Sequence, residues 1–211
     1  MTDVLSGAMM VIAKTPEVGR VKTRLCPPLS LVQACDVAWA CLLDTLDTAA
    51  LVPAARHVLV LDGEPGPWIP GIFEVIPQRG NGLAQRLAAA FSDVADAGIV
   101  VAMDTPQVTL EQLSVGLRAI AGGADAVLGL AEDGGYWVIG LRRGVDVTAV
   151  FDNVPMSTSK TGVAQRRQLD LLGLCTTMLP SHRDIDTMED LYVVVAGMAG
   201  GRLPDLVSGF N

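Results

Sequence analysis

Charged and polar residues follow four short apolar runs of this sequence, at the points where the runs end. The clusters combine Lys and Arg with carboxylates, which are side chains that can bind a phosphate or a metal ion. In an open parallel α/β sheet, ligands bind beyond the carboxyl ends of the strands, so these clusters would meet in one crevice. This pattern favours an enzyme that handles nucleotides. The four clusters are residues 14–24, 104–106, 132–135 and 184–186.

The first cluster is a basic segment in which Pro16 and Gly19 bend the chain between four cations. A pyrophosphate needs several donors at once, and arginine supplies a planar fork of donors while lysine supplies a point charge. We therefore predict that the segment binds the phosphates of a nucleotide. A solvated surface loop is the alternative, because blocks of charge are usually surface features. The predicted phosphate ligands are Lys14, Arg20, Lys22 and Arg24.

Two familiar nucleotide motifs are missing from the sequence. Neither G-x-x-x-x-G-K-[ST] nor G-x-G-x-x-G follows the first apolar run, so a P-loop NTPase and an NAD-type dehydrogenase lose their main support. A glycine-rich bend at 78–83 offers another nucleotide contact. Gln78 could read a base edge there and Arg79 or Arg86 could reach a phosphate. Alternatively, Asn81 caps the next helix and Arg86 faces solvent.

A possible metal ligand follows the run at 98–103. Asp104 comes directly after this run, and Pro106 stops the strand and fixes the turn. Mg²⁺ and Mn²⁺ are usually held by one or two protein carboxylates together with substrate phosphates. We predict that Asp104 is one such ligand and that the second carboxylate comes from Asp184 or Asp186.

The elements that must position these residues alternate between strand and helix. Repeated βα units predict a doubly wound, mostly parallel α/β sheet flanked by helices, and the run at 136–141 could be antiparallel. Ser30, Thr109 and Thr187 are expected N-caps. We expect strands at 7–13, 57–61, 72–76, 98–103, 125–130, 136–141 and 174–179, and helices at 31–49, 83–94, after 109, at 157–172 and a last one from 187.

Length and composition limit the possible classes of protein. We expect one domain over residues 1–211, stabilised by a core and by no disulfide, with the cysteines as small buried side chains. A net charge of −8 argues against nucleic acid and anionic membranes as partners. The apolar runs are too short to cross a bilayer, and no secretory signal is recognisable, so we expect a cytoplasmic protein.

Four motifs occur in order and at spacings that resemble the DUF2064 family. They are K-x-P-x-x-G-R-x-K-T-R-L at 14–25, D-T-P at 104–106, E-D-G-G-Y at 132–136 and D-I-D-T-x-E-D-L at 184–191. This family is described as glycosyltransferase-A-like and has members named for arsenosugar biosynthesis. The resemblance extends from Met10 to about Tyr192. It implies the nucleotide-diphospho-sugar transferase (GT-A) fold, a Rossmann-like mixed sheet. The K-T-R-L segment also looks like that of the phospholactate and phosphoenolpyruvate guanylyltransferases.

The resemblance also implies roles for particular residues. Related nucleotidyltransferases bind metal through the Asp of a similar D-T-x-E-D motif, so Asp186 is the preferred second ligand and Asp184 the reserve, with helix capping as the alternative for Asp186. The sequence departs from the usual pattern in having no D-x-D at Asp104. It also has Gln107 where the family often has an acid and Met156 where it often has Trp.

The E-D-G-G-Y motif is the candidate acceptor side of the site. We predict Asp133 as a general base or as a hydrogen-bond partner of a sugar hydroxyl, with Gly134, Gly135 and Tyr136 as acceptor-binding residues. Tyr136 and Trp137 could offer a flat surface to a sugar ring. Alternatively, D-G-G is only a turn between two strands, with Tyr136 and Trp137 covering opposite faces of the sheet.

These expectations combine into a transferase hypothesis. A sugar would pass from a nucleotide-sugar donor to a small-molecule acceptor, with Mg²⁺ or Mn²⁺ stabilising the diphosphate leaving group. The second hypothesis is nucleotidyl transfer, in which a phosphate or phosphonate acceptor attacks a nucleoside triphosphate and pyrophosphate is released. The third, from a different class, is a catalytically silent module that only binds nucleotides.

Overall fold

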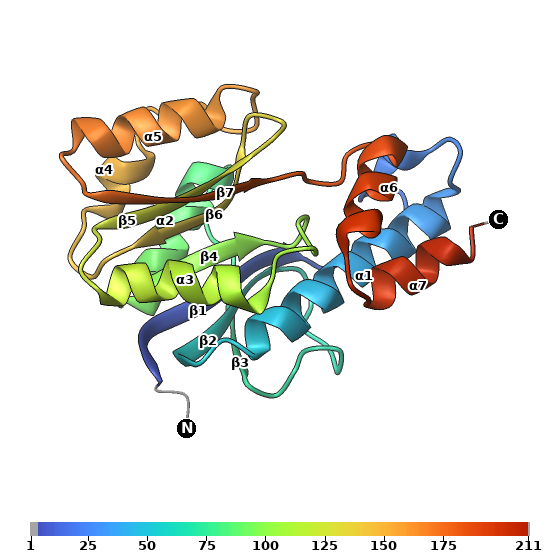
Figure 1. Cartoon of the computed structure of the whole chain (residues 1–211), viewed down its shortest axis with the longest axis horizontal. Helices are drawn as coiled ribbons and strands as arrows, with labels where there is room; N and C mark the ends of the chain where they lie inside the picture. The colour runs from blue at the N-terminus through green and yellow to red at the C-terminus, as the bar shows by residue number, and fades with distance from the viewer. Residues whose placement is uncertain (1–3, 211) are drawn as a thin grey trace.

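The structure, a computed structural model, describes residues 4–210 and is built around a seven-stranded mixed sheet (Figure 1). The strand order is β3-β2-β1-β4-β6-β5-β7, and every pair is parallel except the two pairs made by β6. The mixed, mostly parallel sheet predicted from the sequence is confirmed, and so is the antiparallel strand. The strands are β1 (Leu5–Lys14), β2 (Ala54–Asp62), β3 (Phe73–Pro77), β4 (Gly98–Ala102), β5 (Ala126–Ala131), β6 (Tyr136–Leu141) and β7 (Thr176–His182).

Helices cover both faces of this sheet (Figure 1). One apolar cluster joins the sheet to α1 and α3, and a second joins it to α2, α4 and α5. The central strands β1, β4 and β5 are therefore buried on both sides, which explains their continuous apolar sequences. The helices are α1 (Leu31–Ala50), α2 (Leu83–Val94), α3 (Leu110–Ala121), α4 (Val147–Phe151), α5 (Thr161–Leu171), α6 (Met188–Gly197) and α7 (Arg202–Ser208).

Three helices begin at the N-caps that the sequence predicts. The Ser30, Thr109 and Thr187 side chains each accept a hydrogen bond from the backbone N–H three residues later. In each case the side chain of that third residue accepts a hydrogen bond from the cap backbone, which completes a capping box. The helix starts could be found from the sequence because both halves of this motif are local.

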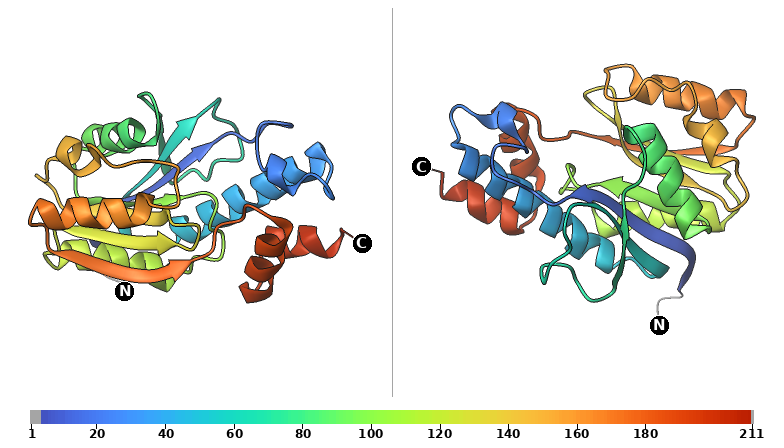
Figure 2. Two further views of the ribbon diagram at one scale, coloured as in Figure 1. Left: turned by 90° about the horizontal axis from the view of Figure 1, so that it is seen from above. Right: turned by 180° about the vertical axis from the view of Figure 1, so that it is seen from behind.

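The helices of the C-terminal third differ from the prediction in three places. α4 is a short helix that was not predicted from the sequence. The helix expected at 157–172 begins only at Thr161, because Ser157 has a positive φ of 57° and the Thr161 hydroxyl donates to the Pro155 carbonyl in a tight turn. The helix starting at Thr187 is also not the last one. α7 follows it and packs on α1, where Asp44 accepts hydrogen bonds from the backbone N–H groups of Arg202 and Leu203 (Figure 2).

The cysteines also differ in part from the prediction. All four are free thiols; Cys35 and Cys41 are buried, as expected, but Cys26 is half-buried and Cys175 is exposed. Within residues 4–210, none of the helices combines the length and the apolar character needed to cross a bilayer. Residues 1–3 and 211 of the predicted domain lie outside the described range.

The sheet topology brings the predicted clusters to one edge. β1, β4, β5 and β7 run in the same direction, so the residues that follow them leave the sheet on the same side. From β1 the chain first builds the sheet outward on one side, through β2 and β3. It then crosses back to add β4 on the other side of β1, so the strand order reverses at β1. Open α/β sheets bind ligands at such a switch point.

Candidate functional site

Lys22 lies at the centre of the candidate site and joins three distant parts of the chain. Its ammonium group is 2.6 Å from the Asp104 carboxylate and donates to the Ile185 carbonyl at 2.5 Å. The side chain is only 9% exposed. Burial lowers the pKa of Lys22, but the charge of Asp104 and the hydrogen bond to it outweigh burial and raise the pKa above its ordinary value. Lys22 is therefore a permanent cation that holds the basic segment against Asp104 and residue 185.

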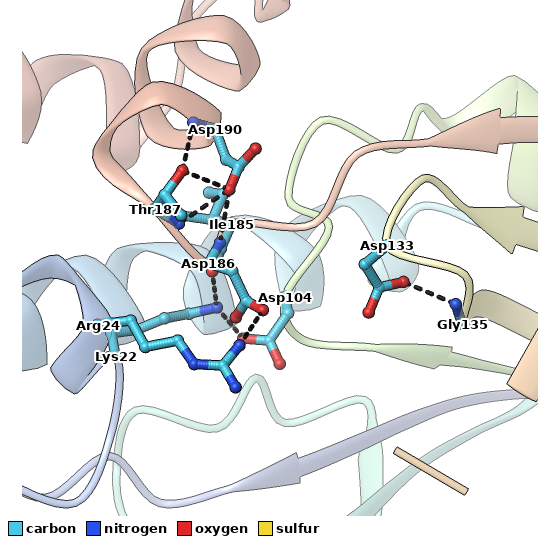
Figure 3. A network of polar contacts seen from close by, with 9 residues as sticks. All are labelled: Lys22, Arg24, Asp104, Asp133, Gly135, Ile185, Asp186, Thr187 and Asp190. Atoms are coloured by element: carbon cyan, nitrogen blue, oxygen red, sulfur yellow. Dashed lines mark hydrogen bonds and ion pairs between the residues drawn. The ribbon is translucent and has the colours of Figure 1, made fainter. Parts of the chain in front are cut away.

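Arg24 and Asp186 form a second ion pair beside Lys22. Arg24 Nη1 donates to Asp186 Oδ2 at 2.6 Å, and the arginine side chain is 74% exposed (Figure 3). The short 3₁₀ helix at Thr23–Leu25 turns Arg24 outward and Leu25 inward, where Leu25 packs under the C-terminal helices. An exposed arginine can leave one carboxylate for a stronger anion at little cost, so Arg24 is free to bind a phosphate.

The start of α6 shows which of the residues near it cap the helix. Thr187, not Asp186, is the N-cap, and the Asp190 carboxylate accepts hydrogen bonds from the Thr187 hydroxyl and backbone. Burial tends to raise the pKa of Asp190, but these hydrogen bonds outweigh it and lower that pKa overall. Asp190 therefore serves the helix, whereas the Asp186 side chain points toward Arg24 and Asp104 (Figure 3).

The main cavity of the site has a volume of about 510 Å³. Asp104 and Asp186 line both this cavity and a smaller one of about 200 Å³ that also contains Lys14 and Lys22. The main cavity therefore continues into the basic segment. Its remaining polar lining includes Arg24, Asp133, Tyr136, Ser157, Thr158, Ser159, Thr161 and Asp184.

Asp133 lies in the turn between β5 and β6, across the main cavity from the ion pairs (Figure 3). Its carboxylate accepts a hydrogen bond from the Gly135 backbone N–H at 2.7 Å and is otherwise exposed. Gly134 has a φ of 94°, and a Cβ placed on it would lie 2.1 Å from the Ser159 carbonyl oxygen. The turn requires glycine because it lets the 157–161 loop approach the backbone directly. That contact places Asp133 and the loop on the same cavity.

The two aromatic residues after this turn point to opposite faces of the sheet. Trp137 is only 2% exposed and donates its indole N–H to the Pro180 carbonyl. It therefore belongs mainly to the core and, although it reaches the wall of the main cavity, it exposes too little surface to stack on a sugar ring. Tyr136 lines the cavity and its hydroxyl contacts Met156 Sδ at 3.7 Å. Burial raises the pKa of Tyr136, so its hydroxyl stays protonated.

Asp184 is a cavity residue that the sequence placed only in reserve. Burial, followed by the nearby charge of Asp133, raises its pKa from 3.8 to about 6. The sequence alone could not show how the environments of Asp184 and Asp186 differ, because both lie in one D-I-D motif. The path of the chain after β7 ends at His182 decides where each side chain lies. The 157–161 loop was also missed, because only the packing of Gly134 against Ser159 brings it to the cavity.

Gln78, the predicted base-reading residue, lines a third cavity and is hydrogen-bonded to the ends of two strands. The Gln78 side-chain amide donates to the Ala13 and Val60 carbonyls at 2.7 and 3.1 Å, and its carbonyl accepts from Arg86. Gln78 therefore ties the ends of the strands together. Arg86, expected to face solvent, instead pairs with Asp62 at 2.8 Å and lines the same third cavity, of about 350 Å³, with Lys14 and Asp104.

Two of the predicted phosphate ligands have surface partners. Arg20 is 76% exposed and pairs with Glu17 within its own loop at 2.8 Å. Arg79 is exposed and pairs with Asp93 on α2. Neither residue lines the three cavities described above, whereas Lys14, Lys22 and Arg24 do. The structure thus divides the six predicted phosphate ligands into those on the crevice and those beside it.

The carboxylates of the site fit a metal ion only together with a substrate. Among residues 4–210, no three His, Cys, Asp or Glu side chains converge closely enough to hold a metal by themselves. Asp104 and Asp186 nevertheless face the same two cavities, and each is neutralised by a cation. Two carboxylates beside a phosphate site are the protein share of ligands that Mg²⁺ and Mn²⁺ commonly use.

Solved structures of other proteins share this fold. The chain superposes with a TM-score of 0.87 and 23% identity on a "putative nucleotide-diphospho-sugar transferase" from Desulfovibrio desulfuricans G20, over 96% of this chain and 94% of that one. The fold is that of the nucleotide-diphospho-sugar transferases. The chain belongs to the DUF2064 family, described as "Uncharacterized protein conserved in bacteria", whose model matches residues 44–158. The motifs at 14–25 and 184–191 lie outside this match.

More distant structures include proteins with a bound nucleotide or metal ion. CMP:2-keto-3-deoxy-manno-octonic acid synthetase in complex with CTP is 14% identical, with a TM-score of 0.55 over 89% of this chain and 96% of that one. Rv0371c of Mycobacterium tuberculosis H37Rv in complex with manganese is 19% identical, with a TM-score of 0.51 over 92% and 98%. No protein of curated function matches the chain in sequence.

Proposed function

We propose that this protein is a glycosyltransferase that moves a sugar from a nucleotide-sugar donor to the hydroxyl group of a small acceptor. The observation that carries the proposal is the pairing of Lys22 and Arg24 with Asp104 and Asp186 at one end of a cavity that has Asp133 at its other end. Cations and carboxylates at one end suit a diphosphate with a metal ion. A single exposed carboxylate at the other end suits a general base.

The basic segment would bind the diphosphate of the donor. Arg24 and Lys14 are the exposed cations on the crevice, so they would contact the phosphate oxygens. Lys22 would act as a positioning residue, because its ammonium group is already bound to Asp104 and Ile185. Fixed positive charge beside the leaving group stabilises the negative charge that develops there as the sugar departs.

Asp104 and Asp186 are the residues that would hold Mg²⁺ or Mn²⁺. The bound ion would supply a Lewis acid that neutralises the diphosphate. The manganese complex of Rv0371c, which has a similar fold, supports this assignment. On the acceptor side, Asp133 would accept the proton of the attacking hydroxyl, and Gly134, Gly135 and Tyr136 would shape the surface on which the acceptor lies.

Nucleotidyl transfer is the second candidate, and the likeness to CMP:2-keto-3-deoxy-manno-octonic acid synthetase in complex with CTP favours it. The same crevice would then bind a nucleoside triphosphate. The two reactions differ in their products: glycosyl transfer releases a nucleoside diphosphate and nucleotidyl transfer releases pyrophosphate.

The continuous seven-stranded sheet supports our inference that the chain forms one domain.

A thermal-shift screen of nucleotides and sugar nucleotides, with and without Mn²⁺, tests the proposal. A ligand that binds only the folded protein stabilises it by about 2.7 kcal/mol at a concentration of a hundred times its Kd. We expect a nucleoside diphosphate or its sugar ester to stabilise the protein, and the ligand found to yield nucleoside diphosphate on turnover. Pyrophosphate release would support the second candidate, and no stabilisation by any nucleotide would contradict both.

A further inference from the structure

The two ends of the main cavity differ in their balance of charge. At the donor end, Asp104 is paired with Lys22 and Asp186 is paired with Arg24, each at 2.6 Å. At the other end, Asp133 and Asp184 line the cavity, and within residues 4–210 neither makes an ion pair. Two carboxylates without a cationic partner therefore face the space that an acceptor would occupy.

The cations closest to this end either form ion pairs with other carboxylates or lie outside the cavity lining. Arg183 precedes Asp184, but its guanidinium lies 2.8 Å from Glu132 and 3.6 Å from Asp190. These three residues line a neighbouring cavity of about 250 Å³ that Asp133 and Asp184 also line. Arg183 therefore borders both carboxylates, but it makes its ion pairs with Glu132 and Asp190. Lys160 is an exposed residue of the 157–161 loop itself, but it is not part of the main cavity lining. Arg24, the one cation in that lining, is bound to Asp186.

The rest of the acceptor end is lined by hydroxyl groups. Ser157, Thr158 and Ser159 form one wall, and in the described part of the chain the hydroxyls of Ser157 and Ser159 have no hydrogen-bond partner. Tyr136 and Leu83 add apolar surface. Hydroxyl groups can both donate and accept, so this wall suits a ligand whose own groups are hydroxyls.

From these contacts we infer that the acceptor is a hydroxyl-bearing molecule, such as a sugar or polyol, without a phosphate or carboxylate near its reacting end. An anionic group placed there would face the Asp133 and Asp184 carboxylates, which form no ion pair, because the nearby cations Lys22 and Arg183 are bound to other carboxylates. Repulsion between like charges is an effective means of rejecting a ligand. The inference rests on the proposed function in taking this cavity as the acceptor site. It also weighs against a phosphate or phosphonate acceptor in that site.

The test compares probes that share one ring and differ in charge: methyl glucoside, methyl glucuronide and glucose 6-phosphate. Each is titrated into the full-length protein saturated with the nucleotide found by thermal shift, and the amide signals of Gly135 and Ser159 are followed by NMR. We expect the neutral probe to bind about tenfold more tightly than either anionic probe, the scale expected for one or two like charges at close range in a partly solvated site.

Matched variants separate local charge from net charge. In the double variant Asp133→Asn and Asp184→Asn, the affinity ratio of anionic to neutral probe should rise about tenfold. The control Asp36→Asn and Asp170→Asn changes two exposed acids on α1 and α5 and should leave the ratio as in the parent. Asparagine at 133 can still accept the hydrogen bond from Gly135, so the turn is retained.

Three results would overturn the inference: an anionic probe that binds the parent as tightly as the neutral one, a ratio that the double variant leaves unchanged, or no binding by any probe. Failure of the proposed function has a different signature, since it is the lack of nucleotide binding in the separate thermal-shift screen. In that case the probe titration is run without nucleotide, and its charge preference is read from the same two amides.

Discussion

The two ends of the cavity, which we propose bind the donor and the acceptor, are built in opposite ways. At the donor end, Lys22 and Arg24 neutralise Asp104 and Asp186, and Lys22 is almost completely buried among its partners. At the acceptor end, Asp133 is exposed and Asp184 has no ion-pair partner among residues 4–210. The first arrangement is stable before any ligand binds, whereas the second leaves carboxylates available to react. Substitutions at the donor end should therefore affect stability and affinity, and those at the acceptor end should affect turnover.

The largest effect is expected at Asp133. Asp133→Asn keeps an oxygen that can accept the Gly135 N–H but removes the base, so the rate of glycosyl transfer should fall roughly 10²- to 10⁴-fold. The nucleotide affinity and the melting temperature should stay near those of the parent. Steady-state kinetics with saturating donor measures the effect. A rate within threefold of the parent would exclude Asp133 as the general base.

Lys22→Ala should give the largest loss of stability. It leaves Asp104 without its cation and the Ile185 carbonyl without its donor. Because Lys22 is buried although Asp104 is partly exposed, the loss should lower the free energy of unfolding by about 2 kcal/mol. Chemical denaturation measures the loss, and Arg20→Ala is the control, because its exposed pair with Glu17 should contribute less than about 0.5 kcal/mol.

Arg24→Ala tests phosphate binding without this structural cost. Arg24 and Arg20 come from the same segment and are equally exposed, at 74% and 76%, but only Arg24 lines the main cavity. We expect Arg24→Ala to weaken nucleotide binding about tenfold, as expected for one charge-assisted hydrogen bond to a phosphate, and Arg20→Ala to leave it unchanged. Calorimetry compares the two variants. Equal affinities would show that Arg24 makes no contact with the nucleotide.

The smallest effect concerns the pH dependence of stability at Asp184. Its pKa is about 6 in the folded protein and about 3.8 when unperturbed, so the unfolded chain ionises first as the pH rises. Stability is therefore lost between about pH 4 and pH 6, and the penalty is constant above that window. Asp184→Asn should raise the free energy of unfolding at pH 7.5 by about 1 kcal/mol, a value reduced for partial solvation.

The gain from Asp184→Asn should disappear below pH 4, where the carboxyl group is protonated in both states. Denaturation curves at pH 3.5 and 7.5 check this, with Asp170→Asn as the exposed control on α5. A gain of the same size at both pH values would mean that the effect comes from packing and not from the charge of Asp184.

Most of the fold could be predicted from the sequence, because its signals are local. The apolar runs of β1 and β4 are continuous, as buried parallel strands require, and the capping boxes at Ser30 and Thr109 involve residues three positions apart. The start of α5 could not be predicted in this way. It depends on Thr161 bonding to Pro155 and on Gly162 packing beneath the 134–135 turn, which lies far away in the sequence.

The same distinction applies to the candidate site, of which one part could be predicted from the sequence and another part could not. The sequence by itself determined the types of residue that follow each strand, and therefore that cations and carboxylates would meet at one edge of a parallel sheet. Only the tertiary structure decided which of them are paired: Lys22 with Asp104, Arg24 with Asp186, and Arg79 with Asp93 away from the crevice. The physical reason is that charge pairing depends on distances of a few ångströms between side chains from separate elements, and residue types carry no information about such distances.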